Sequence, residues 1–179
     1  DAGSTISVEA LKSAFNVLGL NLKDIRNVLL THGHMDHAGG AYSLVKATKA
    51  DIWAHALYKL LQDIDVNGPL DQNNVLMKSA IEEINSHTEE LYDPWKGFRQ
   101  GPRYERHTHY AELRRLVEVK HQIHGDEVKP PFTFLHTPGH SPDELTIGLD
   151  KILFSGDHVL PEISPHPTLK IKYPDHISS

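Results

Sequence analysis

Three histidines and an aspartate fall within six positions of the stretch THGHMDH, which covers residues 31–37: His32, His34, Asp36 and His37. In an extended segment, residues i and i+2 point to the same side, so His32 and His34 can reach one metal ion together. Asp36 and His37 follow where the chain turns towards a helix, and they could serve a second ion. Neutral imidazole and carboxylate suit Zn²⁺, Fe or Mn²⁺. The stretch therefore predicts part of a metal centre.

Two distant segments offer further ligands at the ends of predicted strands. His140 follows the Pro-Gly turn of HTPGH, and Asp157 closes FSGD after a short apolar run. A catalytic zinc site has three protein ligands plus water, so two histidines are not enough. Alone, each of these residues would be interpreted as an ordinary surface turn. Because α/β sheets build sites where several strand ends converge, we expect His140 and Asp157 to join the cluster.

Short helices and strands are expected to position these groups in one layered α/β domain spanning residues 1–179. Helices are predicted at 8–20 (Ser7 as N-cap, Gly19 as C-cap), 41–50, 56–64, from residue 75, and 111–120. Strands are predicted at 28–30, 51–55 and in three runs beginning at 132, 144 and 151. The polar, aromatic segment 91–110 is interpreted as a surface insertion or lid. Its Trp95, Phe98 and Tyr104 would line a substrate entrance or, as the favoured interpretation, pin the insertion to the body.

Composition limits the function classes. Eighteen basic and 24 acidic residues give a formal net charge of −6, which argues against nucleic acid as a partner and favours a small-molecule substrate. The absence of cysteine removes thiolate ligands, disulfides and a cysteine nucleophile. No apolar run is long enough for a membrane span, and no signal peptide is visible, so a soluble, cytoplasmic protein is expected. The sequence leaves the oligomeric state open.

Four motifs resemble those of the metallo-β-lactamase superfamily. THGHMDHAGG is similar to its His-x-His-x-Asp-His signature, HTPGHS to its third-histidine motif, and FSGD to its bridging-aspartate motif. The opening DAG resembles the family's first Asp-x-Gly motif. All four occur in the family's order and bracket residues 1–157.

The resemblance implies an αββα sandwich with a metal centre at one edge. His32, His34 and His140 would bind a first metal, Asp36 and His37 a second, and Asp157 would bridge the two. Asp1 would orient ligands or water through hydrogen bonds. The implied cofactor is one or two Zn²⁺ ions, with Fe or Mn possible.

The implied activity is hydrolysis of an ester, thioester, lactone or amide. A water held between two ions is deprotonated near neutral pH and attacks the carbonyl. Asp36 would orient this nucleophile or shuttle a proton, so Asp36 and Asp157 are the catalytic candidates.

The sequence departs from the family pattern at both ends. The family's second metal takes one more histidine from a later motif, and His158, His166 and His176 all lack its setting. Strands are also expected to precede Asp1. We therefore predict a domain incomplete at both ends, with the first ligand set intact and the second under-ligated. The remaining histidines are interpreted as solvated or without an assigned partner: His107, His109, His121, His124, His55, His87 and His136.

Two alternatives remain open. A mono-iron thiol or persulfide dioxygenase of the same fold would use only the first-metal ligands. A non-catalytic metal-binding or scaffold member would keep the fold but lose ligands. The substrate is not readable from the sequence, because specificity lies in loops around a shared centre.

Overall fold

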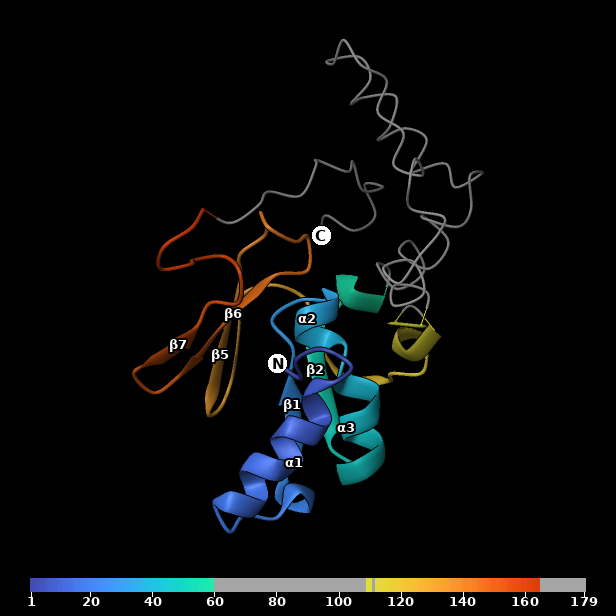
Figure 1. Ribbon diagram of the computed structural model, residues 1–179. Helices are drawn as coiled ribbons and strands as arrows, with labels where there is room; N and C mark the ends of the chain where they lie inside the picture. Colours follow the sequence, from blue (N-terminus) through green and yellow to red (C-terminus); the bar gives the residue numbers. More distant parts are fainter. Residues whose placement is uncertain (60–108, 111, 165–179) are drawn as a thin grey trace.

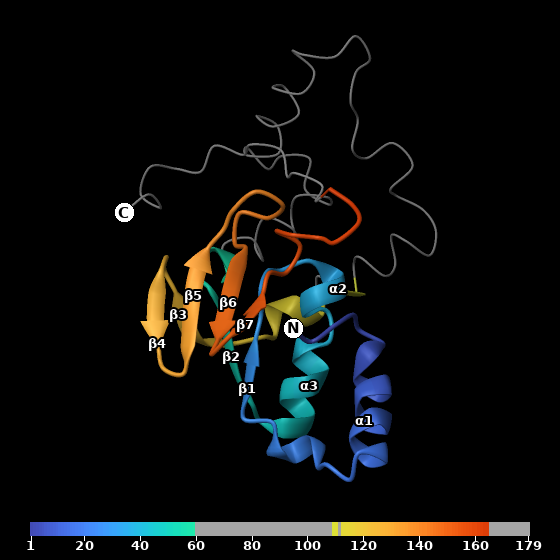
Figure 2. The ribbon, with the colours of Figure 1, turned by 90° about the vertical axis from the view of Figure 1, so that its left-hand side faces the viewer.

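The computed structural model describes residues 1–59, 109–110 and 112–164 (Figure 1). In this part of the chain two β-sheets stack face to face, and helices α1 and α3 cover the outer face of the first sheet (Figure 2). The layered arrangement of helices and sheets agrees with the predicted fold class. None of the described helices is long and apolar enough to cross a membrane.

The first sheet is parallel, in the order β1 (Asn27–Leu29), β2 (Asp51–His55), β3 (Val119–Ile123). Helix α3 (Ala41–Thr48) connects β1 to β2. Alternate side chains of a strand face opposite ways. Val28 and Ile52 therefore pack with the helices, whereas Leu29 and Trp53 pack towards the second sheet.

The second sheet is antiparallel, in the order β4 (Glu127–Lys129), β5 (Phe132–His136), β6 (Leu145–Leu149), β7 (Ile152–Phe154). Phe134, Leu145 and Ile147 form its buried face and enclose Ile123 of β3. At the edge, β7 has all three of its residues exposed. The strands predicted at 28–30, 51–55 and in the last third are therefore all present.

Helix α1 (Ser7–Val17) is shorter than predicted: its C-cap is Leu18, one residue before the predicted Gly19, and its start also differs. Gly19 has φ +67°, its N–H donates to the carbonyl of Asn16, and the Leu20 N–H donates to that of Phe15. This pair of hydrogen bonds needs a residue in the left-handed conformation, which glycine adopts without the steric penalty of a Cβ. The prediction of Ser7 as N-cap was wrong: Ile6 is the cap, and the Ser7 Oγ accepts the Ser4 N–H at 3.0 Å. The short 3₁₀ turn η1 (Leu22–Asp24) follows.

The helix predicted at 111–120 was too long. Residues 109–110 and 112–115 are helical, and β3 begins at Val119. The alternation of β3 is hidden in the sequence because His121 occupies the position between Val119 and Ile123. The His121 ring stacks on Trp53 with centroids 4.0 Å apart, so it fills a place where an apolar side chain would have indicated a strand. Strand β4 and the one-turn helix α2 (Met35–Ala38) were also not predicted.

Several predictions lie outside the described residues. They are the helix from residue 75, the insertion 91–110 up to residue 108 with Trp95, Phe98 and Tyr104, and the tail from residue 165. Of the helix predicted at 56–64, residues 57–59 are helical and the rest lie outside the described part. The single-domain boundary at 1–179 stays a prediction.

Leu30 links the fold to the histidine motif and provides a test of the core. It is fully buried, and its N–H donates to the Trp53 carbonyl at 2.8 Å. We expect Leu30→Ala to lower the free energy of unfolding by about 2–5 kcal/mol, because the lost burial and the cavity add. Chemical denaturation of the metal-free protein measures this. Leu18→Ala, at a position 69% exposed, is the control, and equal losses in both variants would contradict the packing described here.

Candidate metal centre

The predicted site residues come together at one edge of the sandwich. His32 and His34 follow β1, and His37 lies on α2. His140 is in the loop between β5 and β6, and Asp157 follows β7. Two groups of candidate ligand atoms result, in each of which all the atoms lie within 4.8 Å of one another: His32, His34 and His140, and His32, His37 and Asp157.

The first group consists of three imidazole nitrogens. The distance from His32 Nε2 to His34 Nδ1 is 3.0 Å, and that from His34 Nδ1 to His140 Nε2 is 2.8 Å. The three rings stand nearly perpendicular to one another, at 81–90°. Nitrogens bound to one tetrahedral zinc would lie about 3.3 Å apart. The donor set therefore fits a single cation after a small outward adjustment.

The carboxylate of Asp157 lies between the two groups. Its Oδ1 is 3.2 Å from His37 Nε2, and its Oδ2 is 3.3 Å from His140 Nε2. One oxygen thus faces each group, which is the disposition that a bridging ligand requires. The ligand roles of His37 and Asp157 remain predictions, to which this geometry is favourable.

Asp36 lies at the margin of the site. Its side chain is 73% exposed, and its Oδ2 is 3.7 Å from His37 Nε2. It belongs to neither group of converging atoms. Helix α2 explains this placement, because consecutive helical residues do not share a face. The predicted metal-binding role of Asp36 stays a prediction.

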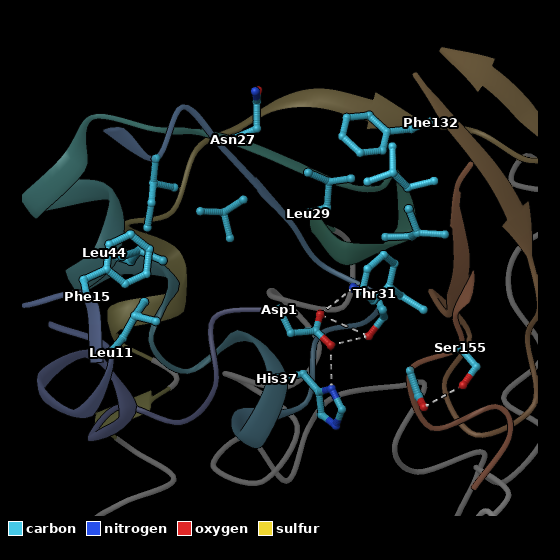
Figure 3. A pocket seen from close by; sticks show the side chains of 16 residues that line it. Asp1, Leu11, Phe15, Asn27, Leu29, Thr31, His37, Leu44, Phe132 and Ser155 are labelled. Atoms are coloured by element: carbon cyan, nitrogen blue, oxygen red, sulfur yellow. Dashed lines mark hydrogen bonds and ion pairs between the residues drawn. The ribbon is translucent and has the colours of Figure 1, made fainter. Parts of the chain in front are cut away.

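Asp1 connects both groups through one carboxylate (Figure 3). It accepts hydrogen bonds from the Thr31 N–H at 2.7 Å and from the Thr31 hydroxyl at 3.0–3.1 Å. Its Oδ2 lies 2.9 Å from His37 Nδ1, and the Thr31 hydroxyl is 3.1 Å from His32 Nδ1. If both histidines donate through Nδ1–H, their Nε2 lone pairs are left for the centre of the site. These contacts are those expected of an orienting residue.

Glu144 is a buried residue of the site that sequence reasoning missed. It is fully buried at the start of β6, and its Oε1 accepts the Asp157 N–H at 2.8 Å and lies 3.7 Å from His32 Nδ1. Burial raises the pKa of its carboxyl to about 7, against the lowering effect of the Asp157 N–H. The available signal was a lone acidic residue opening an apolar strand.

Gly156 makes room for this contact. Its φ is +55°, and a Cβ there would lie 2.6 Å from Glu144 Oε1 and 2.8 Å from Thr31 Oγ1. Both the backbone conformation and the close approach therefore require glycine in the turn before Asp157.

The imidazole of His32 is neutral. Burial is the main cause that lowers its pKa to about 2, followed by repulsion from His37, His34, His140 and Arg114. A neutral ring with its lone pair towards two other imidazoles is the form that binds a metal ion. The chemistry of the donor set thus fits the implied cofactor.

Three other histidines have partners that the sequence did not reveal. The His55 and His136 rings stack with centroids 4.1 Å apart, and the His136 Nε2–H donates to the Pro142 carbonyl at 2.8 Å. His121, interpreted above as solvated, stacks on Trp53 and lies 3.2 Å from Asp51 Oδ2. His109 and His124 are exposed, as expected. His87, His107, His166 and His176 lie outside the described residues.

An apolar pocket of about 620 Å³ opens beside the centre (Figure 3). Its walls include Phe15 of α1, Leu29 of β1 and Phe132 of β5. Its polar end is formed by Asp1, Thr31 and His37, so the pocket reaches the network that joins the two groups.

The fold and site define the class of the protein. The sequence profile of the metallo-beta-lactamase superfamily matches residues 1–65 and 73–178, and the chain belongs to this superfamily. A metallo-beta-lactamase family protein from Thermus thermophilus shares the fold with a TM-score of 0.60. It is 18% identical, and the match covers 98% of this chain and 54% of that protein. The metallo-beta-lactamase MIM-1 of Novosphingobium pentaromativorans gives a TM-score of 0.50 at 24% identity, covering 83% and 44% of the two chains.

A curated relative matches locally. Ribonuclease J 1 of Streptococcus pyogenes is 33% identical over 69 residues, which is 38% of this chain and 12% of that protein. The chain therefore spans a small part of this relative and about half the length of the solved structures. The predictions of family and fold class are confirmed.

The Thr31 hydroxyl provides a test of the orienting network. We expect Thr31→Val to weaken zinc binding about 10–100-fold, because His32 Nδ1 and Asp1 lose their shared partner. Competition with a chromogenic chelator measures the dissociation constant. Thr133→Val makes the same change at an exposed position of β5 and should leave affinity unchanged. Equal affinity of all three proteins would refute the role of this network.

His55, which lies outside both groups of candidate ligands, is expected to make the stability of the fold depend on pH. Burial, then the neighbouring His136 and His124, lower its pKa to about 4. The unfolded state therefore takes up a proton near pH 6.5, before the folded state does, and stability is lost as the pH falls from about 6.5 to about 4. Between these two pH values we expect the free energy of unfolding of His55→Phe to fall less than that of the wild type, by on the order of 1–2 kcal/mol. Urea denaturation at both pH values measures it, with His109→Phe as the exposed control. Parallel stability profiles for wild type and His55→Phe would exclude this source.

Proposed function

We propose that this chain is a metal-dependent hydrolase that cleaves an ester, thioester, lactone or amide. The observation that carries the proposal is the convergence of the His32, His34 and His140 nitrogens beside the Asp157 carboxylate. Three nitrogen donors leave one coordination position open on a tetrahedral ion, as catalytic rather than structural sites do. Six potential ligands with no cysteine favour zinc, with iron or manganese as further candidates.

A bound cation would supply Lewis acidity, polarising the substrate carbonyl and lowering the pKa of water. The protein groups around it have separate tasks. His32 and His37 are held in one tautomer by Thr31 and Asp1, so their Nε2 atoms stay directed at the ion positions. Asp157 would hold the two positions at a fixed separation, since each of its oxygens faces one group.

Asp36 is the candidate for proton transfer. Its exposed carboxylate lies 3.7 Å from His37 Nε2, at the boundary between the site and solvent. A group there can accept a proton from water at the centre and release it to bulk solvent. This role does not require that Asp36 also bind a metal ion.

Phosphodiester hydrolysis of RNA is a second candidate. The local similarity to Ribonuclease J 1 favours it, and a metal centre can serve phosphoryl as well as carbonyl chemistry. The net charge of −6 argues against it, because RNA binding gains affinity from basic surface. The carbonyl hydrolase therefore remains the leading proposal. Iron in the purified protein, together with oxygen uptake on a thiol or persulfide, would instead support a dioxygenase.

The first-group ligands allow a direct test. We expect His34→Ala to lose most bound zinc and to lower hydrolysis of a thioester, lactone, ester and β-lactam panel about 100-fold or more, because two nitrogens hold the ion poorly. Elemental mass spectrometry gives the metal content, and a short RNA belongs in the panel. His121→Ala, which removes a histidine outside both groups, is the control. Metal content that is unchanged in His34→Ala would overturn the assignment.

Asp36 separates proton transfer from metal binding. We expect Asp36→Asn to reduce kcat about 10²–10⁴-fold while the first-group metal content stays near that of the wild type. Steady-state kinetics and elemental analysis on the same preparations measure both. A variant with full kcat would remove Asp36 from the mechanism.

A further inference from the structure

Gly33, the residue between His32 and His34, is enclosed by charged groups from two other segments. A Cβ on Gly33 would overlap Arg114 Nη2 and would lie 3.1 Å from Asp143 Oδ2. No side chain can therefore be added at Gly33 unless these groups move. The guanidinium of Arg114 occupies the space that a side chain at position 33 would take if the residue were not glycine.

Arg114 is only 2% exposed, which is unusual for a permanently charged side chain. Its guanidinium carbon lies 4.7 Å from the centre of the Tyr58 ring and 5.8 Å from that of Tyr110. Aromatic faces attract a cation at such distances. Burying a guanidinium costs several kcal/mol before its partners compensate. A buried guanidinium directly behind the His32–His34 segment is therefore an expensive way to fill space, and its contacts with this segment are the feature that needs an explanation.

Tyr110 contacts the same residue from a second side. Its hydroxyl donates to the Gly33 carbonyl at 2.5 Å. Tyr110 and Arg114 belong to the helical residues 109–110 and 112–115, and the 5.8 Å between the guanidinium carbon and the Tyr110 ring centre places both side chains on the same side. Together they fix both the Cα and the carbonyl of Gly33, and hence the direction in which the chain passes from His32 to His34.

Asp143 brings the segment of the third histidine to the same point. It is 1% exposed, and its Oδ1 accepts the Ser141 hydroxyl. The Ser141 carbonyl in turn accepts the Gly139 N–H at 3.4 Å, next to His140. Arg114 Nη2 and Asp143 Oδ2 thus both adjoin Gly33, at the place where the two ligand-bearing segments meet.

We infer that Arg114 and Tyr110 are positioning residues of the metal centre, which set the spacing of His32 and His34 relative to His140. They act on the Gly33 backbone and lie outside both groups of candidate ligand atoms. Because their effect is read through cation binding, the inference rests on the proposed function. A guanidinium suits this place better than an ammonium, since its planar fork presents five donors in a fixed geometry.

The test uses Tyr110→Phe, which removes one O–H and keeps the ring, and Arg114→Lys, which keeps the charge and loses the fork. Tyr42→Phe, a change of the same kind on α3, is the control. Three quantities are measured on the full chain: the Zn²⁺ dissociation constant, the visible absorption bands of the Co²⁺-loaded protein, and thermal unfolding of the metal-free protein. The cobalt bands report ligand geometry, which a purely structural role would not change.

We expect Tyr110→Phe and Arg114→Lys to raise the Zn²⁺ dissociation constant about 10–100-fold and to shift the cobalt bands, with Tyr42→Phe unchanged. Tyr110→Phe should do so with little change in thermal unfolding, so it decides the matter if Arg114→Lys fails to fold. Wild-type affinity and bands in Tyr110→Phe would overturn the inference and leave the proposed function standing. A wild-type chain that binds neither cation would overturn the proposed function and the inference with it.

Discussion

The burial of His32 is the constraint on which the site depends. An imidazole that is 1% exposed cannot carry a charge cheaply, and its two nitrogens both need partners. Nδ1 meets the Thr31 hydroxyl with the Glu144 carboxyl beyond it, and Nε2 meets His34. These partners in turn hold the two aspartates, because Asp1 accepts hydrogen bonds from Thr31 and the Asp157 N–H donates to Glu144. The positions of the other site residues therefore follow from the need of one buried, neutral imidazole for hydrogen-bond partners.

The two sheets place this ring where segments from both can reach it. The chain leaves the parallel strand β1 into the His32 motif, while β5, β6 and β7 of the antiparallel sheet deliver His140 and Asp157. Between the sheets, Trp53 lies almost parallel to Phe134, with ring centroids 5.9 Å apart, and His55 stacks on His136. Aromatic contacts of this kind resist sliding of one sheet over the other. The relative position of the ligand segments is thus set by packing some distance from the ligands.

The sequence predicted the parts of this arrangement that depend on local pattern. Short apolar runs indicated β1, β5, β6 and β7, and the ligand types marked the residues that follow them. Strand β3 escaped because His121 interrupts its apolar alternation. Glu144 and Arg114 escaped for another reason: a charged side chain gives no sign in the sequence that it will be buried by residues distant along the chain. The sequence also did not indicate how differently the two neighbours Asp36 and His37 are exposed, with 73% of the Asp36 side chain but 17% of the His37 side chain accessible, because this depends on the direction of helix α2.

The distance along the chain between the two halves of the first group has an entropic consequence. His34 and His140 are 106 positions apart, yet their ring nitrogens lie 2.8 Å from each other. The entropy lost on closing such a loop grows only with the logarithm of its length, so doubling the intervening chain costs only about 0.6 kcal/mol. Lengthening or shortening the part of the β2–β3 connection that precedes Tyr110 therefore changes the entropic cost of assembling the site very little. Natural variation in the length of that part can proceed almost independently of the metal-binding chemistry, as long as Tyr110 and Arg114 at the end of the connection keep their contacts with Gly33.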